Sequence, residues 1–298
     1  MRRKHNTLVV AACSPASHSF LPAEYDRATV RMIKGLERDP ARIAAHVDRF
    51  LDHHARMLRR AGGAGAAVAV IPEDCLRLVG VISRHRGESF CAKAICAALA
   101  RYEEVVGAIC REYSMCVVGG TVTWRKGHFY NTAIMLDATG KPIASYDKTH
   151  LPRNGEHRCL TPGADLPVFD TPVGRVGFLI CWDIIFPETY AVLALKGAEI
   201  IFQPTFGHWE EWSDVTARSR AHDWSVPLVV SMWGGCSCII DQEGNMAART
   251  GRVPDSLAVA PLRMSENRRF IYLTDTRRQK PLERRLDLYR ALLRDSKE

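Results

Sequence analysis

The 298-residue chain lacks any apolar run long enough to span a bilayer. It also lacks a linker rich in proline, glycine or serine, and no segment is repeated. The basic beginning, MRRKHNTLVVAAC, has no clean small-residue cleavage site after its short apolar stretch, which argues against a secretion signal. We therefore expect one domain over residues 1–298 and no membrane partner.

Cysteine is present ten times, but never at the spacing of a disulfide framework, a zinc knuckle or a redox pair. Reduced thiols in a cytoplasmic enzyme are the simplest interpretation. The neighbours His53 and His54 point in different directions on a helix, so they do not favour a shared metal ion. GGAGAA lacks the lysine of a phosphate-binding loop. We expect no metal and no cofactor.

The formal net charge is +8, and residues 263–298 carry 11 Lys and Arg against 6 Asp and Glu. A nucleic-acid surface is one interpretation of such a basic segment. The segment has no aromatic interleaving and no recognisable nucleic-acid-binding motif, so we expect no nucleic-acid partner. We interpret it as a basic C-terminal tail that is solvated or contacts another subunit.

Helical patterns alternate along the chain with apolar runs of strand length. Helices are predicted over 38–61 and 91–113, and a charged terminal helix over 282–298. Hairpins are predicted at DATGK, at Thr171–Gly174 and around Gly244. Residues 14–40 show little periodicity and are expected to form a long loop. The alternation predicts an α/β layered fold with a mixed sheet.

Cys181 stands in GFLICWDIIFPE, directly after a strand-like run and before Trp182 and Asp183. Taken alone, an unpaired cysteine is more often a buried structural thiol than a nucleophile. Strands that end at a polar turn are, however, where α/β proteins place reactive side chains, close to backbone N–H groups that can bind an anion. This position makes Cys181 a candidate nucleophile.

A thiol nucleophile needs a base and a partner that stabilises negative charge. Glu73, in VAVIPEDC, follows Pro72, which cannot continue a central strand, so the run would bring its carboxylate to the same sheet edge as Cys181. Lys148 ends the second strand of a hairpin, where an inward lysine is costly unless it is paired. Glu156 follows eight positions later and could be its partner. A surface turn, a solvated lysine and a loop charge remain the alternatives for these three residues.

Four segments, in order, resemble the nitrilase or carbon–nitrogen hydrolase superfamily: VIPED, YNTAIMLDATGKPIASYDKTHLP, GFLICWDIIFPE and LKGAEIIFQPT. The resemblance runs from about residue 65 to 290. It implies a four-layer α-β-β-α sandwich, a Glu-Lys-Cys triad, and assembly into a homodimer or higher homo-oligomer. The chain departs from the family in reading RAHDW at 220–224, where Arg-Ala-x-Glu-Asn is common, and in a longer segment before Glu73.

Carried over position by position, the resemblance implies four catalytic residues. Glu73 matches the general base, Lys148 the catalytic lysine and Cys181 the nucleophile. Glu156 matches a second glutamate that helps to position the lysine and the substrate.

The resemblance also suggests where the substrate lies. The backbone N–H of Trp182 would join the catalytic lysine in stabilising an oxyanion. The family places the segment after QPT beside the substrate, which suggests Phe206, His208 and Trp209 as substrate-binding residues.

We expect a thiol hydrolase that cleaves the C–N bond of a small amide or N-carbamoyl compound through a thioester. A nitrilase with the same triad is the alternative, and a catalytically silent scaffold or binding protein is a more remote one. Trp182 is typical of nitrilases, whereas Asp183, FPE and YDKTHLP favour the amide-cleaving branches. Arginines such as Arg153, Arg158 or Arg218 could bind a carboxylate on the substrate.

Overall fold

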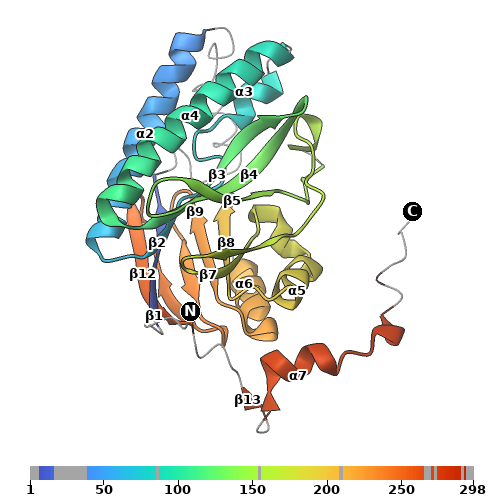
Figure 1. Ribbon diagram of the computed structural model, residues 1–298. Helices are drawn as coiled ribbons and strands as arrows, with labels where there is room; N and C mark the ends of the chain where they lie inside the picture. Colours follow the sequence, from blue (N-terminus) through green and yellow to red (C-terminus); the bar gives the residue numbers. More distant parts are fainter. Residues whose placement is uncertain are drawn as a thin grey trace.

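Two six-stranded sheets lie face to face, and helices cover the outer face of each (Figure 1). This is the four-layer α-β-β-α sandwich that the resemblance implied. The computed structural model describes residues 7–16, 39–84, 87–153, 156–207, 211–264, 270–271, 274–289 and 292. Most of the loop expected over 14–40 lies outside the described residues.

The first sheet has the strand order β12-β1-β2-β3-β4-β5. Its strands are β12 (Ser256–Arg263), β1 (Thr7–Ser14), β2 (Val68–Val70), β3 (Cys116–Arg125), β4 (His128–Leu136) and β5 (Pro142–Asp147). Strands β1, β2 and β3 are parallel to their neighbours within this trio, and the outer pairs are antiparallel. The hairpin predicted at DATGK is confirmed as the β4–β5 connection.

The second sheet has the order β11-β10-β9-β8-β7-β6 and repeats this pairing pattern. Its strands are β6 (Val168–Thr171), β7 (Gly174–Phe178), β8 (Ile200–Thr205), β9 (Leu228–Met232), β10 (Cys238–Ile240) and β11 (Met246–Arg249). The two remaining predicted hairpins are confirmed as β6–β7 and β10–β11. A short separate pair joins β13 (Phe270–Ile271) and β14 (Thr274–Asp275).

Helices form the outer layers. The α-helices are α2 (Pro40–Gly63), α3 (Val79–Arg84), α4 (Glu88–Tyr113), α5 (Pro187–Leu195), α6 (Glu211–Trp224) and α7 (Thr276–Leu282), and short 3-10 turns are η2 (Glu156–Arg158), η3 (Cys181–Ile185) and η4 (Leu286–Leu288). Helix α2 begins two residues after the predicted start, because the Asp39 carboxylate caps it by accepting from the N–H groups of Ala41 and Arg42.

Alternation along each strand divides the apolar side chains between two cores. In β3, Val118 faces the second sheet while its neighbour Val117 faces α2 and α4. In β8, Phe202 faces the first sheet while Ile201 packs under α5 and α6. Because both faces of each sheet are covered, the central strands are nearly continuous apolar runs.

The terminal helix expected over 282–298 is wrong for the described part of that segment. Helix α7 ends at Leu282, one residue after Pro281, and residues 283–289 contain only the single 3-10 turn η4. The apolar side chains of Leu286 and Leu288 are exposed, so no core stabilises a longer helix there. Figure 1 shows this tail extending away from the four layers.

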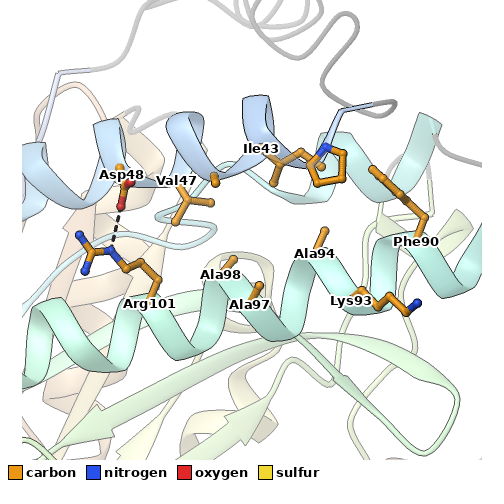
Figure 2. A pocket seen from close by; sticks show the side chains of 11 residues that line it. Ile43, Val47, Asp48, Phe90, Lys93, Ala94, Ala97, Ala98 and Arg101 are labelled. Atoms are coloured by element: carbon orange, nitrogen blue, oxygen red, sulfur yellow. Dashed lines mark hydrogen bonds and ion pairs between the residues drawn. The ribbon is translucent and has the colours of Figure 1, made fainter.

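A groove of about 480 Å³ lies between α2 and α4 on the outer surface (Figure 2). Apolar side chains such as Ile43 and Val47 form its floor, and the Asp48–Arg101 ion pair lies at one end. None of the candidate site residues lines this groove. Within the described residues, no helix combines the length and apolar character needed to cross a membrane.

Candidate active site

The candidate catalytic residues meet where strands of both sheets end. Glu73 and Lys148 follow β2 and β5 of the first sheet, whereas Cys181 follows β7 of the second. The expectation that Glu73 and Cys181 share one sheet edge is therefore wrong. They come together because the two sheets pack face to face, and the thiol is close enough for the charges of Glu73 and Lys148 to act on its pKa.

Cys181 is the first residue of the tight turn η3, which begins three positions after β7 ends. Its φ is 45°, in the left-handed region that a residue with a side chain adopts at a cost. The Gln203 amide, from β8, donates to the Cys181 carbonyl at 3.3 Å. Arg220, from α6, donates to the carbonyl of Ile184 at the far end of η3 at 3.3 Å. Neighbouring elements thus hold the turn that presents the thiol.

The thiol itself is protonated in the resting site. Burial, together with the charge of Glu73, raises the pKa of Cys181 to about 12, against the opposing charge of Lys148. Backbone N–H groups of Phe206 and Gly207 also oppose this shift. A thiol with so high a pKa needs a base to remove its proton as it attacks.

Glu73 lies in a loop that other elements hold by its carbonyl groups. The Trp233 indole donates to the Glu73 carbonyl at 2.9 Å, and two buried histidines of α2 donate to the next part of the loop, His46 to the Leu76 carbonyl at 3.0 Å. His54 donates to the Cys75 carbonyl at 2.8 Å, and burial lowers the pKa of this histidine to about 3, which keeps it neutral. The loop therefore presents Glu73 from a fixed backbone.

Gly120 of β3 permits the close approach of this loop. A Cβ atom at Gly120 would lie 2.7 Å from Glu73 Cα, which is far inside van der Waals contact. The loop is also tied to β3 by the Cys75 N–H, which donates to the Gly120 carbonyl at 2.8 Å. A side chain at Gly120 would displace the candidate base.

Lys148 points inward and is 2% exposed. Its Nζ donates to Glu73 Oε1 at 2.7 Å and to Glu156 Oε2 at 2.6 Å. Burial lowers the pKa of the lysine, but the negative charges of neighbouring carboxylates, Glu73 first and Glu156 with it, outweigh burial and hold the pKa well above its usual range. The lysine is therefore a permanent cation, and its predicted pairing with Glu156 is observed in the structure.

Glu156 opens the short turn η2 and brings a second carboxylate to the lysine. Burial and the neighbouring charge of Glu73 raise its pKa to about 7, against the hydrogen bonds from Lys148 and Asn131. Two carboxylates that share one ammonium group cannot both ionise as easily as isolated ones. The pair consequently holds a proton at pH values where exposed glutamates have lost theirs.

Asn131 of β4 is a site residue that the sequence analysis missed. It is 1% exposed, and its Nδ2 lies 2.7 Å from Glu73 Oε1 and 2.6 Å from Glu156 Oε1. The available signal was an amide inside the otherwise apolar strand FYNTAIML, since a buried amide needs partners.

Asp183 connects the nucleophile turn to the segment around Lys148. It is fully buried, and its carboxylate accepts from the Ile180 N–H at 2.9 Å and the Tyr146 hydroxyl at 2.7 Å. The same carboxylate accepts from the His150 N–H at 3.0 Å. One side chain thus fixes the spacing between the elements that carry the thiol and the lysine.

Of the three residues suggested for substrate binding, Phe206 is described, and His208 and Trp209 lie outside the described residues. Phe206 directly follows β8 and is half-buried. The guanidinium group of Arg77 lies 4.5 Å from the ring centroids of both Phe206 and Trp233. Trp182 is 41% exposed, and the role suggested for its backbone N–H stays a prediction.

The side chains considered for other roles have different partners. Arg218 donates to the Gly244 carbonyl at 2.7 Å, in the β10–β11 turn, while Arg153 and Arg158 are exposed. His53 pairs with Asp255, away from the carbonyl that its neighbour His54 contacts. Among the described residues, no three His, Cys, Asp or Glu side chains are grouped to hold a metal ion.

Comparison with known sequences identifies several relatives. A "hydrolase in pqqF 5′ region" from Pseudomonas protegens is 40% identical over 100 residues, which are 33% of this chain and 35% of that protein. Deaminated glutathione amidase from Homo sapiens is 30% identical and covers 79% of this chain and 77% of its own. Omega-amidase NIT2 from Danio rerio is 28% identical, with 78% and 88% covered.

Solved structures share the fold. A carbon–nitrogen hydrolase from Helicobacter pylori superposes with a TM-score of 0.76 at 18% identity, covering 97% of this chain and 99% of that one. An amidase from Nesterenkonia sp., a double mutant in complex with acrylamide, has a TM-score of 0.71 at 19% identity, with 98% and 99% covered.

The sequence pattern of one family extends over the greater part of the molecule. The carbon–nitrogen hydrolase family model matches residues 38–272, a range that includes both sheets except β1 and contains all four candidate catalytic residues. The resemblance noted from short segments is thereby confirmed, and the chain belongs to the carbon–nitrogen hydrolase family.

Proposed function

We propose that the protein hydrolyses the C–N bond of a small primary amide or N-carbamoyl compound, with Cys181 as nucleophile. The observation that carries this proposal is the buried group of Glu73, Lys148 and Glu156 beside a strained cysteine turn. A buried lysine held by two carboxylates is costly to build for stability alone. Relatives named as amidases support the amide as the substrate class.

The first half of the reaction forms a thioester. Glu73 takes the proton of the Cys181 thiol while the sulfur attacks the amide carbonyl carbon. The Nζ of Lys148 and the backbone N–H of Trp182 stabilise the oxyanion, each donor contributing about 3–4 kcal/mol to the transition state. The C–N bond then breaks, and the leaving nitrogen receives the proton from Glu73 and departs as ammonia or an amine.

The second half releases the acid. A water molecule gives a proton to Glu73 and attacks the thioester carbonyl carbon, and the same donors stabilise the second oxyanion. The C–S bond breaks, the carboxylic acid leaves, and the sulfur regains its proton. Glu156 keeps Lys148 in place through both halves. Phe206, His208 and Trp209 are proposed to contact the part of the substrate beyond the carbonyl.

A nitrile is the alternative substrate, since the same thiol can attack a nitrile carbon. Purified protein should be incubated with primary amides, N-carbamoyl amino acids and nitriles, and ammonia release measured, with the Cys181→Ala variant as control. We expect ammonia from an amide or N-carbamoyl compound. Ammonia from nitriles alone would replace the proposal by a nitrilase, and no release from any of them would favour a silent scaffold.

We also propose that one domain spanning residues 1–298 assembles into a homodimer or higher homo-oligomer. After Glu188 in its first turn, helix α5 carries apolar residues on both its buried and its outer side: Tyr190 and Leu193 are buried, and Leu195 is 38% exposed. Apolar residues on both sides are expected of a helix that is covered on both faces. The basic tail from about residue 263 carries further exposed apolar side chains, such as Leu286 and Leu288. We place both at a contact with another subunit.

The cytoplasm is the proposed location of the enzyme. All ten cysteines are free thiols in the structure, and ten free thiols are typical of a reducing compartment. Oxidation of Cys181 would also remove the nucleophile, which makes a reducing environment a condition of the proposed activity.

A further inference from the structure

Asn131 uses both hydrogens of its amide group on the two carboxylates. Its Nδ2 lies 2.7 Å from Glu73 Oε1 and 2.6 Å from Glu156 Oε1. An amide nitrogen carries two hydrogens and can donate but not accept, so both contacted oxygens must be acceptors. Asn131 therefore favours a proton-free Oε1 on both glutamates, because an ionised oxygen accepts a hydrogen bond more strongly than a protonated one.

Lys148 makes the two carboxylates unequal. Its Nζ donates to Oε1 of Glu73, the same atom that Asn131 contacts, but to Oε2 of Glu156. Glu156 therefore receives one donor on each oxygen, whereas Glu73 receives two donors on Oε1. Oε2 of Glu73 is buried and has no hydrogen-bond partner among the described residues. It is the one oxygen of the four that no described donor occupies.

The thiol proton that reaches this pair during the reaction meets one oxygen that no described donor occupies. On Glu156 it would displace a donor from Lys148 or Asn131 and leave that donor unsatisfied in a buried site, which is costly. On Oε2 of Glu73 it displaces nothing.

We propose that Asn131 is a positioning residue for the general base: it fixes Oε1 of both glutamates as acceptors and leaves Oε2 of Glu73 as the oxygen that takes the thiol proton. This inference rests on the role of Glu73 in the proposed function. Asn131 acts through the glutamates and needs no contact with the substrate.

The test replaces Asn131 by leucine, which is close in size and donates nothing, and by aspartate, which adds a charge. The matched control is Thr123→Val, which removes a buried hydroxyl on the adjacent strand β3, bonded to Thr132 at 2.6 Å. Circular dichroism establishes that each variant is folded. If Asn131→Leu does not fold, Asn131→Ser, which keeps a single donor, takes its place with a smaller expected effect.

The readout is the pH dependence of the reaction of Cys181 with methyl methanethiosulfonate, followed by mass spectrometry of the Cys181 peptide. An ionised carboxylate that loses a hydrogen-bond donor is protonated more easily, and a protonated Glu73 cannot accept the thiol proton. The pH at which the modification reaches half of its maximal rate should therefore be higher in the variant. We expect a shift of about one pH unit in Asn131→Leu, which is a roughly tenfold slower reaction on the acid side, and a larger shift in Asn131→Asp.

Turnover gives the second readout. With a substrate found in the amide panel, kcat of Asn131→Leu should fall about a hundredfold, while KM changes less than threefold, because only proton transfer is affected. A midpoint and rate equal to those of Thr123→Val would overturn the inference. Thiol modification needs no substrate, so a shifted midpoint in a protein that hydrolyses no amide would count against the proposed function alone.

Discussion

Lys148 Nζ lies 2.7 Å from Glu73 Oε1, although 75 positions separate the two residues in the chain. Both side chains are almost completely buried, and each comes from a different strand end of the first sheet. Such a pair exists because the fold brings the two segments together and because a second carboxylate, Glu156, also binds the lysine. The cost of burying these charges is offset only while all three are present.

Removing the lysine should therefore destabilise the protein as well as inactivate it. Lys148→Met leaves the buried Glu73 carboxylate and the partly buried Glu156 carboxylate without a cation, and we expect the free energy of unfolding to fall by about 3–5 kcal/mol. Urea denaturation measures the loss. The matched control is Lys196→Met, which removes an exposed ion pair with Asp165 and should cost less than about 1 kcal/mol. Equal effects of the two variants would contradict the account.

The identity of the base is tested by comparing two variants. Glu73→Gln keeps the shape of the side chain but cannot take a proton, so turnover should fall by several orders of magnitude in a folded protein. His150→Ala should lose far less, because His150 contacts Asp183 rather than the carboxylate pair. Steady-state kinetics on the same substrate decides. The reverse ranking would replace the triad by a Cys-His arrangement.

Glu156 makes stability depend on pH. Its pKa is raised from 4.5 to about 7 in the fold, so between these values the folded protein binds a proton that the unfolded chain does not. The stabilising contribution is complete below pH 4.5 and is lost as the pH rises through 7. The free energy of unfolding of the parent and of Glu156→Gln should be measured by urea denaturation at pH 5 and pH 8.

From pH 5 to pH 8 the free energy of unfolding should fall by about 1–3 kcal/mol more in the parent than in Glu156→Gln. Asp74, whose pKa burial raises to about 7, changes stability in the same direction in both proteins. The difference between the two proteins in how the free energy of unfolding changes with pH therefore reports on Glu156 alone. Parallel slopes would show that Glu156 holds no extra proton in the fold.

Association of subunits should depend on the outer face of α5 and α6. Light scattering at micromolar concentration should give a dimer or larger species, and the double change Leu195→Glu and Val215→Glu should produce smaller ones. Both side chains are exposed, 38% and 64%, in the single chain. Ile143→Glu, a similarly exposed apolar position on β5, serves as control. A monomeric parent would contradict the proposed assembly.

The sequence was sufficient to predict most elements and the candidate catalytic residues, because their patterns are local. The hairpin at DATGK and the strand before Cys181 are visible as short apolar runs with turn residues. The role of Asn131 is not visible in this way. It depends on contacts with carboxylates that are 58 and 25 positions away in the chain, and only the tertiary fold brings these groups together.

Two errors have the same origin. Glu73 and Cys181 both follow apolar runs, a pattern that predicts one shared sheet edge, but such a run does not say to which of two stacked sheets its strand belongs. The charged terminal segment is typical of a helix, but the side chains of Leu286 and Leu288 are exposed in the part of this segment that the structure describes, so no buried face stabilises a helix there. Tertiary contacts override both patterns.

The most direct test of the account is the covalent state of Cys181 during turnover. The enzyme is mixed with an amide that it hydrolyses, and the reaction is quenched in acid. The modified peptide is then identified by mass spectrometry. Cys181→Ala and Cys96→Ser, the latter an exposed cysteine on α4, are treated alike. The account predicts an acyl group on Cys181, no turnover in Cys181→Ala and normal turnover in Cys96→Ser. Full turnover by Cys181→Ala, or an acyl group on another residue, would contradict it.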